Sequence, residues 1–309
     1  MKPDKNERLN SSKENHSYQK PSLAKETKKI LQSNKIRLNK NLGQNYLIDD
    51  FKRKKIIEFG NLKPDDVVLE IGPGIGTLTL EIAKGVKKVI AIEQDLAISK
   101  ILESRLKKES IENVEIINKD ALKIDFPKFN KIISNLPYQI SSPITFKLLE
   151  YDFDLAILMY QKEFTDRMIA NEGDKNYSRL SAMLHFKTKV EFLDNVSPES
   201  FIPKPKVTSS IVRLNPLKNK NIENNEEYSI VCKALFQHKN KKIKNALIDS
   251  RHILGYDDKK EIRQILEESS DKNKDLESFF MQRTIVTSPE EILKIANYLK
   301  PVLKDGAYK

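Results

Sequence analysis

The pattern of apolar and polar positions divides the chain into three parts. Residues 1–35 are polar, rich in Lys, Asn and Ser, and almost without apolar periodicity, so we expect a mobile basic tail. From Val67 onward, short apolar runs alternate with helix-compatible segments. The strands predicted there are 67–71, 88–93, 114–117, 131–134 and 155–160. This alternation is typical of a parallel sheet covered by helices on both faces.

The pattern changes in the second half of the chain. Two β-rich segments, 187–193 and 207–214, are predicted to form an antiparallel pair at the end of the sheet. Beyond Pro216 the apolar residues recur at helical spacing. We therefore predict an α/β fold in which a Rossmann-like domain spans 36–215 and a small all-helical domain spans 216–309.

Composition and charge narrow the class of protein. The 309 residues include 55 Lys and Arg against 44 Asp and Glu, and the resulting charge of +11 favours a polyanionic partner. No apolar stretch is long enough for a membrane span, and the first residues do not resemble a secretory signal. A single cysteine, Cys232, excludes an intramolecular disulfide, and the histidines show no metal-ligand spacing. We expect a metal-free cytoplasmic protein.

A glycine-rich segment follows the first predicted strand of the sheet. Gly72, Gly74 and Gly76 lie in EIGPGIGTLT, at the position where open α/β sheets bind ligands. Glycine lets the backbone approach a ligand closely. The G-x-G-x-G spacing differs from the dinucleotide fingerprint, so a pyrophosphate ligand is less favoured. Taken alone, the segment is also compatible with an ordinary β–α turn.

Acidic residues follow the next two predicted strands. Glu93 ends the second strand, where a carboxylate is placed to accept hydrogen bonds from ribose hydroxyls. Asp120 follows the third strand and is placed to accept a hydrogen bond from an adenine amino group. Together with the glycine-rich segment, these residues predict a pocket for an adenosyl group.

The segment Asn135-Leu136-Pro137-Tyr138 follows the fourth strand and indicates the reaction. An exocyclic amine of adenine is a poor nucleophile because its lone pair is delocalised into the ring. The Asn135 amide oxygen and the Leu136 carbonyl can accept hydrogen bonds from its two N–H groups, and Pro137 favours an extended Leu136. Tyr138 offers a flat face on which an extruded base can stack. The segment predicts methyl transfer to an adenine amine, with an ordinary turn as the alternative.

A series of ordered blocks, from about Leu38 to the C-terminus, resembles the small-subunit ribosomal RNA adenine dimethyltransferases, the KsgA family. The blocks are LGQNYLID (42–49), EIGPGIGTLT (70–79), IEQD (92–95), NLPY (135–138), FIPKPKVTSSIVRL (201–214), LFQHKNKKIKNAL (235–247) and RTIVTSPEEI (283–292). The resemblance implies S-adenosylmethionine as methyl donor and N6,N6-dimethylation of two adjacent adenosines near the 3′ end of small-subunit rRNA. It also implies a monomer that acts on an assembling small ribosomal subunit.

The resemblance also assigns roles to individual residues. The residues that it implies in cofactor binding are Asn45, Leu47, Gly72, Gly74, Gly76, Glu93, Asp120 and Asn135. The catalytic residues that it implies are Asn135, Leu136, Tyr138 and Phe201, with Phe201 stacking on the target adenine opposite Tyr138. Without the resemblance, an aromatic residue at a strand entrance is equally compatible with a place in the core.

A basic run lies in the predicted helical domain. Its residues Lys239, Lys241, Lys242 and Lys244 are expected to contact RNA phosphates as point charges. The family usually has arginines near the start of this run, where this chain has His238 and Lys239. That departure puts in doubt how specifically the run reads RNA, and a solvated helix face is the alternative interpretation.

Two other functions remain open at this point. Large-subunit rRNA adenine methyltransferases of the antibiotic-resistance type share the glycine-rich segment and a similar Asn-x-Pro-Tyr, but the FIPKPKV block and the leucine in NLPY favour the small subunit. A non-catalytic ribosome-assembly factor on the same fold is the other alternative. The presence of Glu93, Asp120 and the segment 135–138 argues against loss of catalysis.

Overall fold

The structure is a computed structural model, and it describes residues 22–34, 36, 44–217 and 226–308. The strands are β1 (Tyr46–Leu47), β2 (Val67–Ile71), β3 (Lys88–Ile92), β4 (Val114–Ile117), β5 (Lys131–Asn135), β6 (Leu155–Gln161), β7 (Thr188–Val196), β8 (Phe201–Ile202) and β9 (Ser209–Pro216). The helices are α1 (Leu23–Ser33), α2 (Asp50–Phe59), α3 (Thr79–Ile82), α4 (Leu96–Lys108), α5 (Ser141–Leu148), α6 (Lys162–Met168), α7 (Arg179–His185), α8 (Glu226–Phe236), α9 (Ile243–Asp249), α10 (Lys259–Asp271), α11 (Lys274–Met281) and α12 (Pro289–Leu299).

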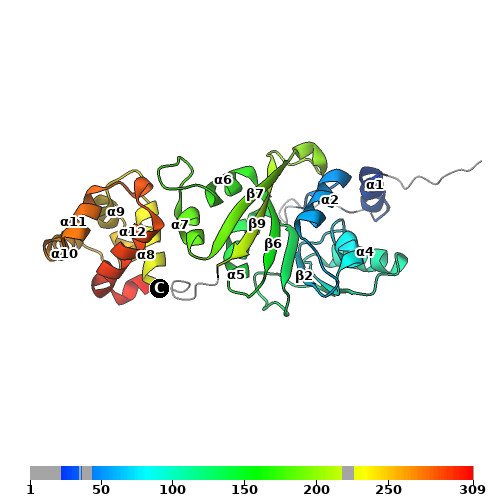
Figure 1. Ribbon diagram of the computed structural model, residues 1–309, viewed down its shortest axis with the longest axis horizontal. Coiled ribbons are helices and arrows are strands. Elements are labelled where there is room, and N and C mark those ends of the chain that lie inside the picture. Colours follow the sequence, from blue (N-terminus) through cyan, green and yellow to red (C-terminus); the bar gives the residue numbers. More distant parts are fainter. Residues whose placement is uncertain (1–21, 35, 37–43, 218–225, 309) are drawn as a thin grey trace, which may run out of the picture.

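Seven strands form one sheet in the order β4-β3-β2-β5-β6-β9-β7. Five neighbouring strands, β4, β3, β2, β5 and β6, are parallel to one another. Strand β9 runs antiparallel to both β6 and β7. The predicted parallel sheet with an antiparallel pair at its end is therefore confirmed. In Figure 1 this sheet occupies the middle of an elongated molecule, with α8–α12 at one end and α1 at the other.

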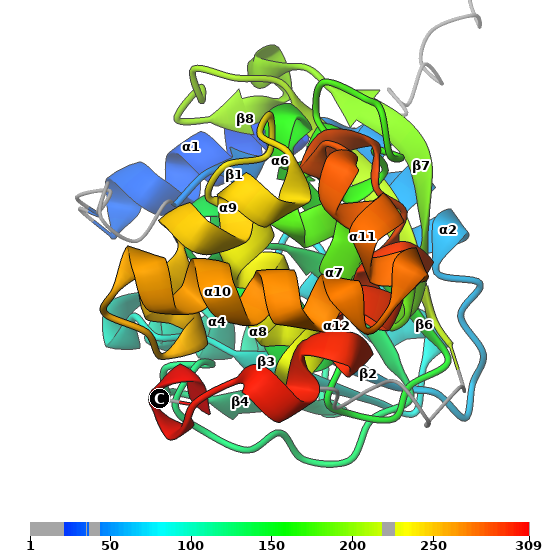
Figure 2. The same ribbon diagram turned by 90° about the vertical axis from the view of Figure 1, so that its left-hand side faces the viewer.

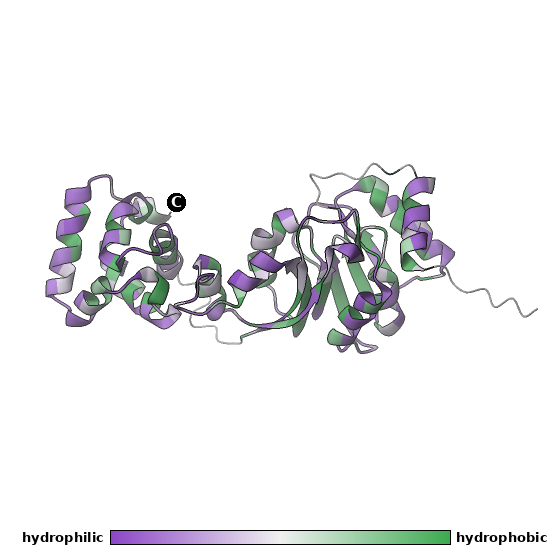
Figure 3. Cartoon of the chain, turned by 90° about the horizontal axis from the view of Figure 1, so that it is seen from above, coloured by the Kyte–Doolittle hydropathy of each residue, from purple (hydrophilic) through white to green (hydrophobic). Residues whose placement is uncertain are grey.

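Helices cover both faces of the sheet, which explains why its strands are almost entirely apolar. In β2, Val68 packs with Ile56 of α2, whereas the next residue, Leu69, packs with Ile144 of α5. Alternate residues of a strand point to opposite faces, so each strand contributes to two layers of core. Figure 3 shows the hydrophobic colour on the strands between these helices.

The order of the strands creates the site for a ligand. Strand β2 pairs with β3 on one side and with β5 on the other. The chain therefore adds β3 and β4 on one side of β2 and then crosses over to add β5 and β6 on the other side. Ligands of open α/β sheets bind in the crevice at such a switch point, outside the carboxyl ends of the strands.

A short pairing of β1 with β8 was not predicted. The partners are Tyr46 with Ile202 and Leu47 with Phe201. Directly opposed residues of an antiparallel pair share a face. Accordingly, Tyr46 and Ile202 pack beside Ile75. Leu47 and Phe201 belong instead to the hydrophobic cluster that contains Val68 of β2 and Ile56 of α2.

Helix α1 corrects the prediction that residues 1–35 form a mobile tail, because residues 22–34 are ordered; residues 1–21 and 35 lie outside the described part of the chain. Ser22 caps the helix by accepting a hydrogen bond from the Lys25 backbone N–H. Leu23, Thr27 and Leu31 are buried at four-residue spacing, on one face of the helix. The stripe is narrow and set among lysines, which explains why the apolar pattern did not reveal it.

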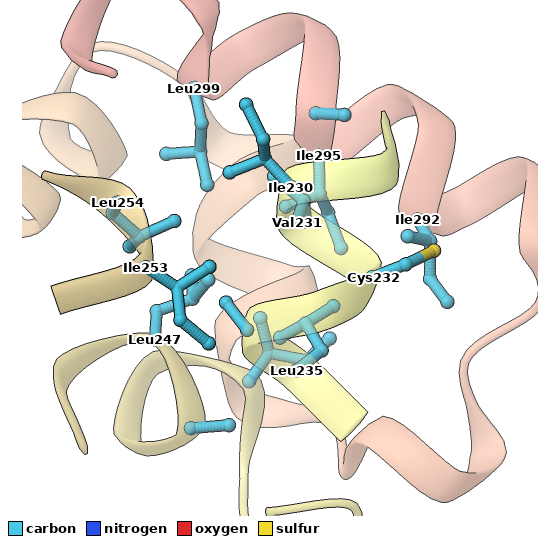
Figure 4. Close-up of a cluster of buried hydrophobic side chains, with 14 of the residues drawn as sticks. Ile230, Val231, Cys232, Leu235, Leu247, Ile253, Leu254, Ile292, Ile295 and Leu299 are labelled. Atoms are coloured by element: carbon cyan, nitrogen blue, oxygen red, sulfur yellow. The ribbon is translucent and has the colours of Figure 1, made fainter. Parts of the chain in front are cut away.

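Helices α8–α12 form the small helical domain of the predicted fold class. Figure 2 views the molecule from this end, with α9, α10 and α11 toward the reader. At its centre, Val231, Cys232 and Leu235 of α8 pack with Ile292 and Ile295 of α12, as Figure 4 shows. Cys232 is fully buried and acts as a small residue of this core.

The boundary at residue 216 stays a prediction. Strand β9 ends at Pro216 and α8 begins at Glu226, which suits a division there. However, Tyr177 and Ala182 come before the boundary and belong to the same hydrophobic cluster as α8. The Tyr228 hydroxyl also donates a hydrogen bond to the Ala182 carbonyl, 2.9 Å away. The helical domain therefore shares its core with α7.

Candidate active site

A cavity opens at the switch point, where the carboxyl ends of β2, β3 and β5 meet. Its walls are formed by residues 44–47, 70–74, 77–78, 92–94, 119–121 and 135–140. It contains about 1060 Å³ of empty space, a volume that includes solvent at its open mouth. The predicted site residues on its walls are Asn45, Leu47, Gly72, Gly74, Glu93, Asp120, Asn135, Leu136 and Tyr138.

The glycine-rich segment wraps around one side of this cavity. Gly74 has a φ of +57°, and a Cβ atom there would lie 2.8 Å from the Tyr46 ring. Another residue here would be strained by the positive φ, and its Cβ atom would force the Tyr46 ring to move. Gly76 differs, because it is absent from the cavity wall and its added Cβ would collide with Leu102 of α4 at 2.5 Å. Gly76 therefore packs the loop on α4, and its predicted contact with a cofactor stays a prediction.

Glu93 is fixed at the edge of the cavity by backbone groups. Its side chain accepts hydrogen bonds from the N–H groups of Gly74 at 3.1 Å and Asp95 at 2.9 Å. Burial raises the pKa of Glu93, and these hydrogen bonds oppose that rise. Asp120 is half-buried on the neighbouring wall and accepts a hydrogen bond from the Leu122 backbone N–H. Both carboxylates therefore have defined positions on one rim.

Asn135 and Tyr138 lie on the opposite wall. Strand β5 ends at Asn135, whose side-chain Nδ2 donates a hydrogen bond to the Asn45 carbonyl, 2.9 Å away. This bond uses the amide nitrogen as a donor and leaves the amide oxygen of Asn135 available as an acceptor. The Tyr138 hydroxyl bonds to the hydroxyl of Ser209 in β9, which holds the half-buried ring. Burial raises the pKa of the Tyr138 phenol, so it stays neutral.

Comparison with known proteins decides the family. The model of the ribosomal RNA adenine dimethylase family matches residues 35–286. This chain belongs to that family. It is accordingly an S-adenosylmethionine-dependent enzyme that dimethylates adenine in ribosomal RNA.

Similar proteins cover nearly the whole chain. A probable ribosomal RNA small subunit methyltransferase A from Methanosphaera stadtmanae is 50% identical over 274 residues, which are 89% of this chain and 98% of the relative. Among solved structures, a dimethyladenosine transferase from Plasmodium falciparum is 31% identical, with a TM-score of 0.71 over 82% of this chain and 97% of that one. The 23S rRNA methyltransferase ErmE is 27% identical, with a TM-score of 0.60 over 82% of this chain and 99% of that one.

Glu70 is a cavity residue to which the sequence interpretation gave no role. It lies in β2, is 2% exposed, and burial raises its pKa to about 8, with the nearby Glu93 adding to the rise. Its Oε2 atom, the Tyr46 hydroxyl and the Thr77 hydroxyl are buried without a hydrogen-bond partner within the described chain. The available signal was an acidic residue inside the apolar run VVLEI. These three buried polar atoms belong to residues of the cavity wall.

Phe201 is not at the cavity, contrary to the placement that the resemblance implied. Its side chain is 2% exposed and is absent from the cavity wall. The β1–β8 pairing explains this position, because Phe201 is opposite Leu47 and both side chains face the core. Phe201 thus lies in the core beside Leu47, and its stacking on the target adenine opposite Tyr138 stays a prediction.

The lysines of the basic run do not form one surface. Lys239 donates hydrogen bonds to the backbone carbonyls of Lys175 at 2.8 Å and Tyr177 at 3.3 Å. Lys241 pairs with Asp249 at 2.6 Å, and Lys244 pairs with Glu267 at 2.9 Å. Lys242 is exposed at the start of α9. Lys239 is thus part of the internal packing, and the other three side chains have different surroundings.

A groove between α9 and α10 collects positive charge from both helices. We call it the basic groove, and its residues are Lys241, Lys242, Asn245, Ile248, Asp249, Lys259 and Arg263. Asp249 binds Lys241 and Lys259 at 2.6 and 2.8 Å, and these two ammonium groups lower the pKa of Asp249 to about 2. Four cations and one carboxylate leave the basic groove strongly positive.

Across 22–34, 36, 44–217 and 226–308, no cluster of three or more His, Cys, Asp or Glu side chains is arranged to hold a metal ion. Within the same ranges, none of the helices combines the length and the apolar character that crossing a bilayer requires.

Proposed function

We propose that the protein transfers methyl groups from S-adenosylmethionine to N6 of two adjacent adenosines near the 3′ end of small-subunit rRNA, two to each. The observation that carries the proposal is the cavity, which gathers Glu93, Asp120 and Asn135 from the ends of successive strands. The 50% identity to a probable small-subunit methyltransferase supports the choice of RNA.

The cavity fits the methyl donor, which supplies an activated methyl group on a sulfonium and also carries an ammonium group. The carboxylates of Glu93 and Asp120 line the cavity and suit a cationic ligand. The unpartnered Tyr46 hydroxyl and Glu70 Oε2 atoms are available to a ligand with many polar atoms. We assign Glu93 to the ribose hydroxyls, Asp120 to the adenine amino group, and Asn45, Leu47, Gly72 and Gly74 to the closer contacts.

On the substrate side, Asn135 positions the amine. Because its Nδ2 is bound to the Asn45 carbonyl, its amide oxygen can accept a hydrogen bond from one N–H group of the target amine. The Leu136 carbonyl accepts from the second N–H, and Tyr138 stacks on the base. The new C–N bond forms as the methyl–sulfur bond breaks, and the amine proton then passes to water. Positioning and electrostatics supply the acceleration, and a monomethylated amine keeps one N–H for a second transfer.

The helical domain is proposed to contact RNA through the basic groove. Lys242 and Arg263 line it together with the Asp249-bound Lys241 and Lys259, and this spacing of cations suits phosphates of an RNA backbone. Of the other predicted RNA contacts, Lys244 adds charge nearby, whereas Lys239 is engaged with backbone carbonyls. The family resemblance supports a cytoplasmic monomer that acts on an assembling subunit.

The large-subunit alternative rests on the resemblance to ErmE, which is 27% identical. The higher identity to small-subunit enzymes favours our proposal. Isolated small and large subunits, each incubated with the protein and methyl-labelled donor, separate the two. We expect label in small-subunit RNA only. Label confined to large-subunit RNA would establish the alternative, and no label in either would favour a non-catalytic assembly factor.

A further inference from the structure

Arg105 of α4 joins two elements that the sequence interpretation left unconnected. One nitrogen of its guanidinium donates a hydrogen bond to the backbone carbonyl of Ile75, 2.5 Å away, inside the glycine-rich segment. The other terminal nitrogen forms an ion pair with Glu26 of α1. The Arg105 side chain is 15% exposed and its Glu26 partner 37%, so the arginine end of this bridge is the part shielded from water.

Apolar packing joins the same two elements. Leu31 of α1 lies in one buried cluster with Ile75, Ile98 and Tyr46. Ile75 is fully buried between Gly74 and Gly76, so its side chain is held by the cluster while its carbonyl is held by Arg105. Helix α1 therefore contacts the outer side of the loop whose inner side lines the cavity.

The glycine-rich segment needs this external support. Gly72, Gly74 and Gly76 all have positive φ, and glycine loses more backbone entropy on ordering than any other residue. The position of the Gly74 N–H also determines the hydrogen bond that fixes Glu93. A loop held in its binding conformation before the ligand arrives binds more tightly, because less ordering remains to be done.

We infer that helix α1 is a positioning element for the donor site, and that Arg105 is the residue through which it acts. The chain thus uses a segment ahead of its methyltransferase sheet to hold the glycine-rich segment in the conformation that binds S-adenosylmethionine. The inference rests on the proposed function, because it concerns the donor cavity. Helix α1 lies at the end of the molecule opposite α8–α12 (Figure 1), so its effect should be separable from RNA contact by the basic groove.

The test measures S-adenosylhomocysteine binding to the full chain by isothermal titration, together with steady-state kinetics. Arg105→Gln should weaken binding about tenfold, because a charge-assisted hydrogen bond is lost. The loss should fall on KM for the donor, with KM for RNA and the titration stoichiometry unchanged. Glu26→Gln should weaken binding less, and adding it to Arg105→Gln should have little further effect. Arg105→Lys, which keeps a cationic donor, should recover part of the affinity.

Glu103→Gln is the matched control, because Glu103 lies on the same helix and forms an exposed ion pair with Lys107. It should leave the dissociation constant unchanged. The inference is overturned if Arg105→Gln binds like the control, or if its loss appears as a reduced stoichiometry, which would indicate partial unfolding. Glu93→Ala separates this failure from failure of the proposed function. If Glu93→Ala also leaves binding unchanged, the cavity is not the donor site.

Discussion

The donor cavity and the basic groove are built on different physical principles. Cavity groups such as Glu93 and Asn135 are largely buried and hydrogen-bonded to backbone atoms of distant segments. Groove groups such as Lys242 and Arg263 are exposed to water, the first at the start of α9 and the second on α10. Buried, pre-positioned groups act strongly and singly, whereas exposed charges act weakly and additively. Substitutions in the two regions should therefore differ both in the size of their effects and in their dependence on salt.

The largest effect is expected at Asn135. Asn135→Ala removes the acceptor for the target amine and should lower kcat by about a hundred- to a thousandfold, as loss of one pre-organised polar group does in other enzymes. Donor binding should change by less than about tenfold, since Glu93 and Asp120 remain. A methylation assay beside isothermal titration measures both quantities. Retained methyl transfer would remove Asn135 from the mechanism.

A smaller effect is expected at Glu93, on the rim of the cavity that is proposed to bind the methyl donor. Glu93→Ala should weaken donor binding by about tenfold or more, because charge-assisted hydrogen bonds to the ribose are lost. Glu115→Ala is the matched control, since Glu115 is an exposed acid on the neighbouring strand β4, paired with Lys88. Titration of both variants checks the assignment. Equal dissociation constants for the two would count against Glu93 as the ribose ligand.

Glu70 provides a test of burial through pH. Its pKa is raised from 4.5 in the unfolded chain to about 8 in the fold, so the folded state keeps a proton that the unfolded state loses. Its contribution to the free energy of unfolding is therefore complete at low pH and falls as the pH rises through this window. The slope approaches about 1.4 kcal/mol per pH unit.

Urea unfolding at a series of pH values, compared between the wild type and Glu70→Gln, isolates this contribution. The variant should be the more stable protein at pH 8, and the difference should shrink toward pH 5. A difference that does not change with pH would mean that Glu70 is ionised in the fold.

The smallest effects are expected in the basic groove. Lys242→Ala and Arg263→Ala should each weaken RNA binding a few-fold and reduce the slope of log affinity against log salt by about one. Lys108→Ala is the control, because Lys108 is exposed on α4 at the other end of the molecule. Binding measured from low to high salt gives the slopes. Slopes equal to that of the control would exclude phosphate contacts in the groove.

Sequence patterns predicted the parts of the molecule that depend on the residues of one continuous segment. Strands β2 and β4 occur at the predicted residues, because continuous apolar runs are what a doubly covered sheet requires. The cavity followed from the same pattern, since parallel strands bring their carboxyl ends to one edge and carry Glu93, Asp120 and Asn135 with them.

Features that depend on partners far away in the chain could not be predicted from the local sequence pattern. The burial of Phe201 follows from its pairing with Leu47, far away in the chain. The engagement of Lys239 depends on carbonyl groups that only the fold brings near it. Helix α1 is stable because Leu31 meets Ile75 and Ile98, and its own composition gives little sign of that.

The central claim is that the cavity dimethylates adenosines of small-subunit RNA. Small subunits that lack this modification, incubated with the protein and S-adenosylmethionine, can be digested with nuclease and their fragments weighed by mass spectrometry. Our account predicts a single fragment near the 3′ end that gains four methyl groups, carried as N6,N6-dimethyladenosine at two adjacent positions. A fragment carrying only monomethyladenosine, or methyl groups on another base, would contradict it.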